Sequence, residues 1–174
     1  MSTTSSGPVN ELTWDAIELA PDLPLSVFTS MEPWHHERIG ALALYCSDGR
    51  WGEAFDEFCH KHLQIPRYDR WAVPGGPAWL ATSDQNEAFF QTAREQFDFL
   101  VRFHELEQVV LITHFGCAYY GHRLEKAPRE CLQAQREDVR TAMHTLHRWY
   151  PDIRVEAYLA MRHGRLLSFH RLAD

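Results

Sequence analysis

The sequence of 174 residues predicts an α/β fold, with a mainly parallel central β-sheet, an antiparallel strand at its C-terminal edge and flanking helices. Short apolar runs without alternation are typical of strands covered on both faces, and segments with helical periodicity separate them. The length suits a single compact domain, and no linker-like stretch divides its middle. A tight His163-Gly164 turn joins the last two predicted strands, which therefore form a hairpin.

The first part of the chain is expected to lie outside this domain. Residues 1–9 are small and polar, and three prolines interrupt any long helix in the following stretch. We therefore assign residues 1–38 to an N-terminal tail and arm, and residues 39–174 to a single domain. A cytoplasmic location is expected, because the sequence shows neither a signal peptide nor an apolar segment long enough to span a membrane.

The first half of the predicted domain contains two strands, each followed by a distinctive motif. An apolar run predicts a strand at 39–45, which stops at Cys46-Ser-Asp-Gly-Arg50. Apolar residues then recur at three- and four-residue spacing over 51–63, which predicts a helix. A second strand is predicted at 68–73. The turn Pro74-Gly75-Gly76-Pro77 after it allows a close backbone approach, because glycine has no side chain.

The next elements are a long helix and the clearest buried strand. One face of the segment 86–105 is apolar, which predicts an amphipathic helix with Asp84 as its cap. The run 109–114 predicts a buried strand, and Phe115-Gly-Cys117 follows it. The short stretch between Gly121 and Arg129 leaves little room for additional helices.

The end of the chain completes the alternation of helices and strands. A helix is predicted at 129–149, and strands at 154–161 and 166–172. In such sheets ligands collect at the carboxyl ends of the strands. Three potential sites lie there: Cys46, the Gly75-Gly76 turn, and His114 with Cys117.

Cys and His at two strand ends indicate a metal site. Zinc in proteins is usually tetrahedral and takes Cys thiolate and His imidazole as ligands. The spacing His114-x-x-Cys117 lets two side chains converge on one ion, and Cys46 joins them if the first and third strands are neighbours. Each piece alone is weak, since His-x-x-Cys pairs occur by chance and a buried Cys is often only a small hydrophobic residue.

Asp48 and Arg50 stand beside the possible ligand Cys46 at alternate positions. A guanidinium can fix a carboxylate by bidentate hydrogen bonding and keep it ionised. In the simpler interpretation, Asp48 only starts the following helix and Arg50 is solvated. Spacing alone does not favour either interpretation.

The motifs resemble those of the β-class carbonic anhydrases over roughly residues 39–172. Cys46-Ser-Asp-Gly-Arg50 is similar to the family's Cys-x-Asp-x-Arg motif, and His114-Phe-Gly-Cys117 to its His-x-x-Cys motif. Arg70-Trp-Ala-Val-Pro-Gly-Gly76 lies where that family has an Arg-Asn-Ala-Gly stretch. The hairpin at the end of the chain also looks like the family's last strands.

The resemblance implies that zinc (Zn2+) is the cofactor and that carbon dioxide and bicarbonate are the substrates. Cys46, His114 and Cys117 would be zinc ligands. Asp48 would either take the fourth position on zinc or pair with Arg50, and these two would be the catalytic residues. Such a chain is expected to form a homodimer or a higher homo-oligomer.

Departures from the family pattern leave alternatives open. Trp71 replaces the family's Asn, and Ala118-Tyr119 follows the second Cys where the family commonly has Gly. The alternative functions are hydrolysis of carbonyl sulfide or carbon disulfide, and zinc binding without catalysis. His122 is one candidate proton shuttle, although a surface histidine without a role is the better interpretation. With 17 Lys and Arg against 24 Asp and Glu, and a net charge of −7, nucleic-acid binding is not expected.

Overall fold

The computed structural model describes residues 27–35, 37–81 and 87–172. The chain divides into two units, Met1–His36 and Glu37–Asp174. Described residues of the first unit form no helix or strand, and several large apolar side chains there are exposed: Val27, Phe28, Met31 and Trp34. The domain boundary expected after residue 38 stays a prediction.

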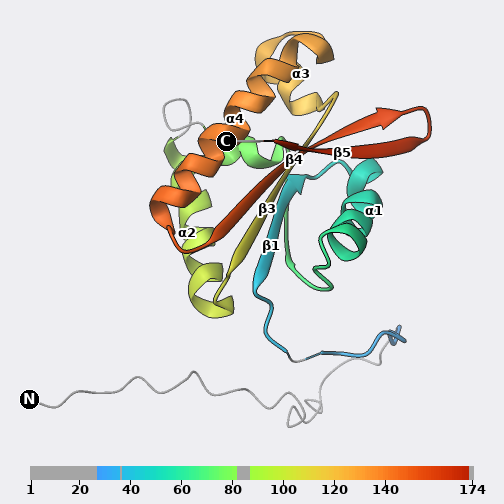
Figure 1. Ribbon diagram of the computed structural model, residues 1–174, viewed down its shortest axis with the longest axis vertical. Coiled ribbons are helices and arrows are strands. Elements are labelled where there is room, and N and C mark those ends of the chain that lie inside the picture. Colours follow the sequence, from blue (N-terminus) through green and yellow to red (C-terminus); the bar gives the residue numbers. More distant parts are fainter. Residues whose placement is uncertain (1–26, 36, 82–86, 173–174) are drawn as a thin grey trace, which may run out of the picture. The chain divides into compact units, whose positions relative to one another are not determined.

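One five-stranded sheet forms the centre of the second unit, in the order β2-β1-β3-β4-β5 (Figure 1). Neighbouring strands are parallel except for the antiparallel pair β4 and β5 at the edge. The strands are β1 (Ala41–Cys46), β2 (Asp69–Val73), β3 (Gln108–His114), β4 (Arg154–His163) and β5 (Leu166–Leu172). The predicted mainly parallel sheet with an antiparallel C-terminal edge strand is confirmed.

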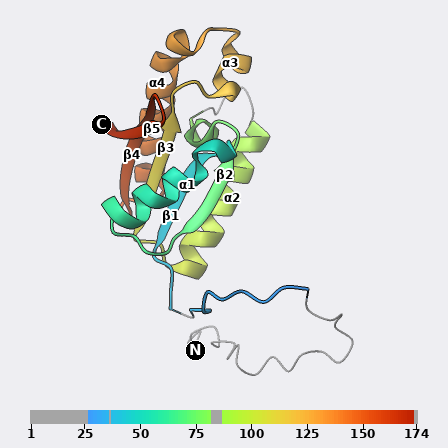
Figure 2. The same cartoon turned by 90° about the vertical axis from the view of Figure 1, so that its right-hand side faces the viewer.

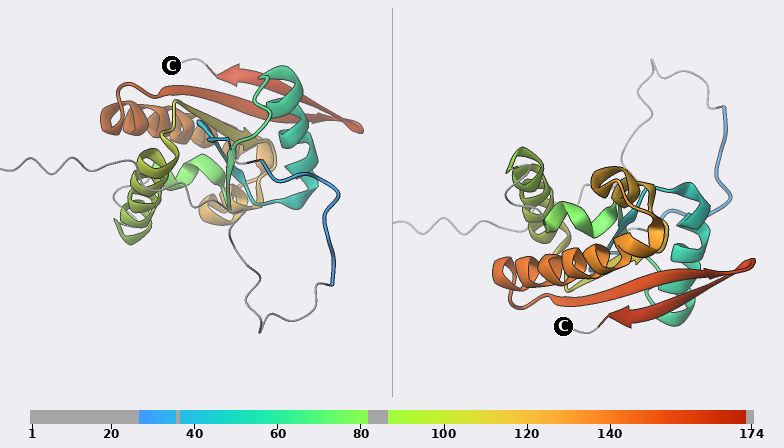
Figure 3. Two further views of the ribbon diagram at one scale, coloured as in Figure 1. Left: turned by 90° about the horizontal axis from the view of Figure 1, so that it is seen from below. Right: turned by 90° about the horizontal axis from the view of Figure 1, so that it is seen from above.

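Helices cover both faces of this sheet (Figures 2 and 3). Helices α2 (Glu87–His104) and α4 (Pro128–Trp149) pack on one face, where Leu44 and Leu111 belong to a fully buried core. Helix α1 (Gly49–Glu57) packs on the other face, against the alternate residues of the same strands. All seven residues of β3 are buried, which explains its unbroken apolar run.

Three helical segments depart from the sequence-based prediction. The helix expected over 51–63 is α1 followed by a π-helix, η2 (Phe58–His62), in which the Leu63 amide bonds the Phe58 carbonyl. Apolar periodicity continues through both segments, so it does not distinguish them. Neither the 3₁₀ helix η3 (Gly76–Leu80) nor α3 (Ala118–Leu124) was predicted. Both are too short for a periodic pattern to develop.

Two other predictions concern the helices. The predicted cap of α2, Asp84, falls outside the described residues. No helix within the described ranges has the length and apolar character needed to cross a membrane.

Candidate metal centre

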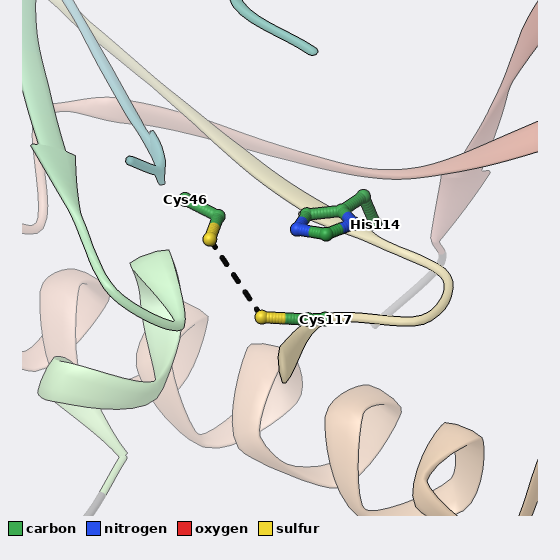
Figure 4. A group of neighbouring side chains, drawn as sticks. All are labelled: Cys46, His114 and Cys117. Carbon is green, nitrogen blue, oxygen red and sulfur yellow. Dashed lines mark hydrogen bonds between the residues drawn. The ribbon is translucent and has the colours of Figure 1, made fainter. Parts of the chain in front are cut away.

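The strand order brings Cys46, His114 and Cys117 together. Cys46 is the last residue of β1 and His114 the last residue of β3, and these two strands are neighbours. A turn at Phe115 and Gly116 then returns the chain, so that Cys117 faces the other two (Figure 4). The potential ligand atoms of the three residues all lie within 4.8 Å of one another, and all three residues are buried.

The distance between the two sulfurs matches the requirement of a tetrahedral metal. Cys46 Sγ lies 3.7 Å from Cys117 Sγ. Two thiolates that each lie about 2.3 Å from one tetrahedral zinc ion would be about 3.8 Å apart. The two cysteines are therefore already spaced as ligands of a single ion.

His114 presents the correct nitrogen for metal binding. Its Nδ1 lies 3.2 Å from the carbonyl oxygen of Phe115, and because a carbonyl only accepts, Nδ1 must be the donor. This bond places the free lone pair of a neutral imidazole on Nε2, which faces the sulfurs in Figure 4. Nε2 is buried and has no hydrogen-bond partner in the described part of the chain. A buried, unpartnered acceptor of this kind fits a metal ligand.

The sulfurs of Cys46 and Cys117 lie within hydrogen-bond distance of each other, and either thiol can be the donor. The hydrogen bond with Cys117 lowers the pKa of Cys46 to about 4, with smaller contributions from the backbone amides of Gly75 and Asp48. The same interaction raises the pKa of Cys117. Since metal binding needs both sulfurs as thiolates, binding releases any proton that the pair holds.

Asp48 both caps α1 and pairs with Arg50, so the helix cap and the ion pair are present together, while the catalytic role of the pair stays a prediction. Its Oδ1 accepts hydrogen bonds from the Arg50 backbone amide at 3.1 Å and from Nε at 2.9 Å, while Oδ2 accepts from Nη2 at 2.5 Å. These bonds lower the pKa of the Asp48 carboxyl to about 2. The carboxylate is therefore ionised at neutral pH and can only accept hydrogen bonds.

The cluster of potential ligands contains the three buried residues and does not include Asp48. Arg50 is mostly solvent-exposed, with 80% of its side chain accessible, whereas the Asp48 side chain is only 18% accessible. The role of Asp48 as a fourth ligand stays a prediction.

The Gly75-Gly76 turn at the end of β2 supports the cysteines by close backbone packing. Both glycines have positive φ, at 81° and 54°. A Cβ added at Gly76 would lie 2.9 Å from the backbone nitrogen of Cys46, and one at Gly75 would lie 2.4 Å from the Tyr119 ring. The close approach expected from this turn is therefore directed at the residues of the site.

Two supporting residues were not predicted from the sequence. The Trp51 ring lies 4.5 Å from the His114 ring, measured between centroids. Gln135 of α4 is fully buried, and its Nε2 donates to the His114 carbonyl at 2.9 Å. Trp51 directly follows the Cys46–Arg50 motif and could have been noticed. Gln135 lies four residues from both Cys131 and Val139, so helical spacing could have placed it on the buried face, unlike the exposed Gln133.

A surface hollow of about 380 Å³ opens beside the Asp48–Arg50 pair. Arg50 and Trp51 lie on one side of it, and Arg162 and Leu167 of the terminal hairpin on the other. Neither Asp48 nor any of the three potential ligands is among the residues that line this hollow.

The remaining residues considered in the sequence have other surroundings. Trp71 is partly buried and packs against the core through Phe97 of α2, with 5.0 Å between ring centroids. His122 is exposed on α3, and its role as a proton shuttle stays a prediction. The other two cysteines of the chain, Cys59 and Cys131, are buried as well. Among the described residues, no second group of three potential metal ligands is found.

Residues 36–166 match the family model described as "Putative carbonic anhydrase". The chain belongs to this carbonic anhydrase family. The family resemblance noted in the sequence motifs is thereby confirmed, and it locates the Cys46, His114 and Cys117 cluster within the part of the chain that carries the family's features. The identity of any bound metal and the catalytic roles of Asp48 and Arg50 stay predictions.

The crystal structure of the β-carbonic anhydrase CafA of the fungal pathogen Aspergillus fumigatus is similar at 12% sequence identity and a TM-score of 0.44. That match covers 79% of this chain and 78% of the fungal chain. No curated protein sequence matches the chain significantly.

Proposed function

We propose that this member of the carbonic anhydrase family binds zinc and interconverts carbon dioxide and bicarbonate. The observation that carries the proposal is the geometry at the ends of β1 and β3. Two sulfurs and one imidazole nitrogen converge there, next to a carboxylate that an arginine holds in its ionised form.

Cys46 Sγ, His114 Nε2 and Cys117 Sγ would hold the metal. When bound, zinc would supply a nucleophilic hydroxide near neutral pH by lowering the pKa of water. Asp48 would accept a hydrogen bond from the attacking group and so orient it toward carbon dioxide. Its oxygens would stay unprotonated during this step because Arg50 keeps the carboxyl pKa low.

Arg50 would act by positioning Asp48. Its bidentate contact fixes the carboxylate plane, and the cap bond to the Arg50 amide fixes the same group relative to α1. The arrangement favours the form in which Asp48 pairs with Arg50 over the form in which it occupies a position on the metal.

Stopped-flow measurement of carbon dioxide hydration by the zinc-loaded protein tests the proposal. We expect activity in the wild type and a loss of about 100-fold or more in kcat for Asp48→Ala and Arg50→Ala, the range typical of a lost positioning group. Zinc content should be unchanged in both variants. Arg67→Ala is the matched control, because Arg67 forms a surface ion pair with Glu37 at 2.6 Å and does not contribute to the cluster.

A zinc-loaded wild type that does not hydrate carbon dioxide would refute the proposal. A parallel assay with carbonyl sulfide and carbon disulfide then separates the two alternatives. Turnover of either compound would indicate a different small substrate, whereas inactivity with all three would indicate zinc binding without catalysis.

A further inference from the structure

The hollow of about 380 Å³ lies between the start of α1, the turn after β3 and the terminal hairpin of β4 and β5. This hairpin runs beside α1 in Figures 1 and 3, and the ring centroids of Phe55 and Phe169 lie 6.1 Å apart there. Trp51 lines the hollow and also contacts the ring of His114. The hollow is therefore a separate space that borders the metal-binding cluster.

The charged residues that line this hollow are both arginines. Arg50 comes from α1 and Arg162 from β4, and no Asp or Glu is among the described residues that line it. The Arg162 side chain forms no hydrogen bond or ion pair with any other residue that the structure describes. The chain as a whole has a net charge of −7, so a hollow lined by cationic groups alone is unusual for it. Such a lining favours an anionic ligand.

Arg50 retains donors for a second anion in addition to Asp48. The Asp48 carboxylate accepts hydrogen bonds from Nε and Nη2 of the guanidinium. Nη1 and the second N–H of Nη2 are not used by this pair. Because 80% of the Arg50 side chain is accessible, these N–H groups can reach a ligand in the hollow.

The charge balance of the hollow favours a monoanion. Asp48 compensates the charge of Arg50, whereas Arg162 is not compensated by any described residue. A carboxylate carries a single charge and matches the donor pattern of a guanidinium. A phosphate group carries nearly two charges at neutral pH and so exceeds the charge that the hollow offers. A carboxylate is therefore the better match.

The size and the apolar lining indicate a ligand with a body larger than bicarbonate. Small-molecule pockets usually measure about 300 to 1,000 Å³ and combine apolar walls with a few polar groups. The hollow falls in this range at about 380 Å³, and Trp51, Phe115 and Leu167 contribute apolar side chains to its lining. A water molecule takes up about 30 Å³, and bicarbonate is only a few times larger, so it would leave most of the hollow to solvent.

We propose that this hollow is a binding subsite for a small organic carboxylate, held by Arg162 and by the free N–H groups of Arg50. The apolar body of the ligand would lie against Trp51, Phe115 and Leu167. This inference does not rest on the proposed function, because binding in the hollow requires neither a bound metal nor turnover.

Titration of the ¹⁵N-labelled full chain with benzoate, followed by two-dimensional NMR, tests the subsite. We expect a dissociation constant in the roughly millimolar range, as is typical of so small a ligand. The largest shifts should occur at the Trp51 indole and at the backbone amides of Gly116 and Arg162, which line the hollow. Benzamide has the same shape without the charge and should bind about tenfold more weakly or worse, because it loses the charge-assisted hydrogen bonds.

Two variants of the same hairpin separate the subsite from general attraction to basic residues. Arg162→Ala should weaken benzoate binding by about tenfold or more. Arg165→Ala is the matched control, because Arg165 lines a different hollow together with Lys61 and Leu166. It should leave the dissociation constant unchanged. Both arginines are exposed, so both variants should fold, and circular dichroism checks this.

The proposal is overturned if benzoate does not bind at high millimolar concentration, or if Arg162→Ala binds it as well as the wild type does. Binding that needs bound metal and survives Arg162→Ala would place the carboxylate on the metal, which also overturns the proposal. A protein that fails to hydrate carbon dioxide but binds benzoate through Arg162 would refute the proposed function and leave the subsite in place.

Discussion

At the scale of single residues, Asp48 has two roles: it caps α1, and in the proposed reaction it orients the attacking group. Its oxygens cap the first turn of α1 and also accept the guanidinium of Arg50. One carboxylate therefore caps the helix and is itself held in place by these bonds, two residues after the potential ligand Cys46. A capping Ser or Thr would satisfy the helix amide but would provide no charge for Arg50.

The charge of Asp48 should contribute to stability only above acidic pH. The folded-state pKa is about 2 and the reference value is 3.8, so the contribution is fully present above 3.8 and is lost as the pH falls toward 2. Asp48→Asn keeps a capping oxygen but lacks the charge. We expect metal-free wild type to be more stable than metal-free Asp48→Asn at neutral pH, and the difference to vanish near pH 2.

Urea unfolding of both metal-free proteins across this range measures the difference in free energy of unfolding. Metal-free protein is needed because protonation of the ligands would otherwise add to the pH dependence. A difference that stays constant down to the lowest pH would show that the Arg50 pairing does not stabilise the fold.

At the scale of elements, the Gly75-Gly76 turn after β2 packs closely against the residues around the metal-binding cluster. Gly76 packs against the backbone of Tyr45 and Cys46, and Gly75 packs against the ring of Tyr119. The turn thus contacts β1, whose last residue is the potential ligand Cys46. It also contacts α3, which directly follows the potential ligand Cys117. Neither contact leaves space for a side chain.

Two glycine-to-alanine changes should have opposite effects. Gly76→Ala forces a Cβ to 2.9 Å from backbone atoms at a φ of 54°, and we expect it to destabilise the protein by about 2 to 4 kcal/mol. Gly52→Ala lies within α1, where the added Cβ meets nothing within 4 Å. We expect it to stabilise the protein by about 0.5 to 1 kcal/mol. Urea unfolding measures both, and a neutral Gly76→Ala would contradict the close packing.

At the scale of the whole molecule, the sequence predicts what depends on continuous patterns. The buried run of β3 and the turn at Gly164 led correctly to a parallel sheet with a terminal hairpin. The approach of Cys46 to His114 followed from the expectation that the first and third strands are neighbours, which the strand order confirms. Motifs at strand ends therefore pointed to the cluster, although each motif alone is weak and the full ligand set rested on the family resemblance.

Features that depend on tertiary contacts were not predictable in this way. Helix α3 begins just after Cys117 and buries only Tyr120, so its seven residues offer no apolar periodicity. Gln135 belongs to a mostly polar helix, and only the packing of α4 against the end of β3 brings its amide to the His114 carbonyl. Contacts between residues distant in the sequence leave no local pattern.

Zinc K-edge X-ray absorption on the purified protein, with elemental analysis, tests most directly whether Cys46, His114 and Cys117 bind one metal ion. We expect one zinc per chain, with two sulfur neighbours at about 2.3 Å and at least one nitrogen at about 2.0 Å. Cys117→Ser should lose this signature, while Cys59→Ser, which changes a buried cysteine outside the cluster, should keep it. Protein without stoichiometric zinc, or zinc without sulfur neighbours, would contradict the account.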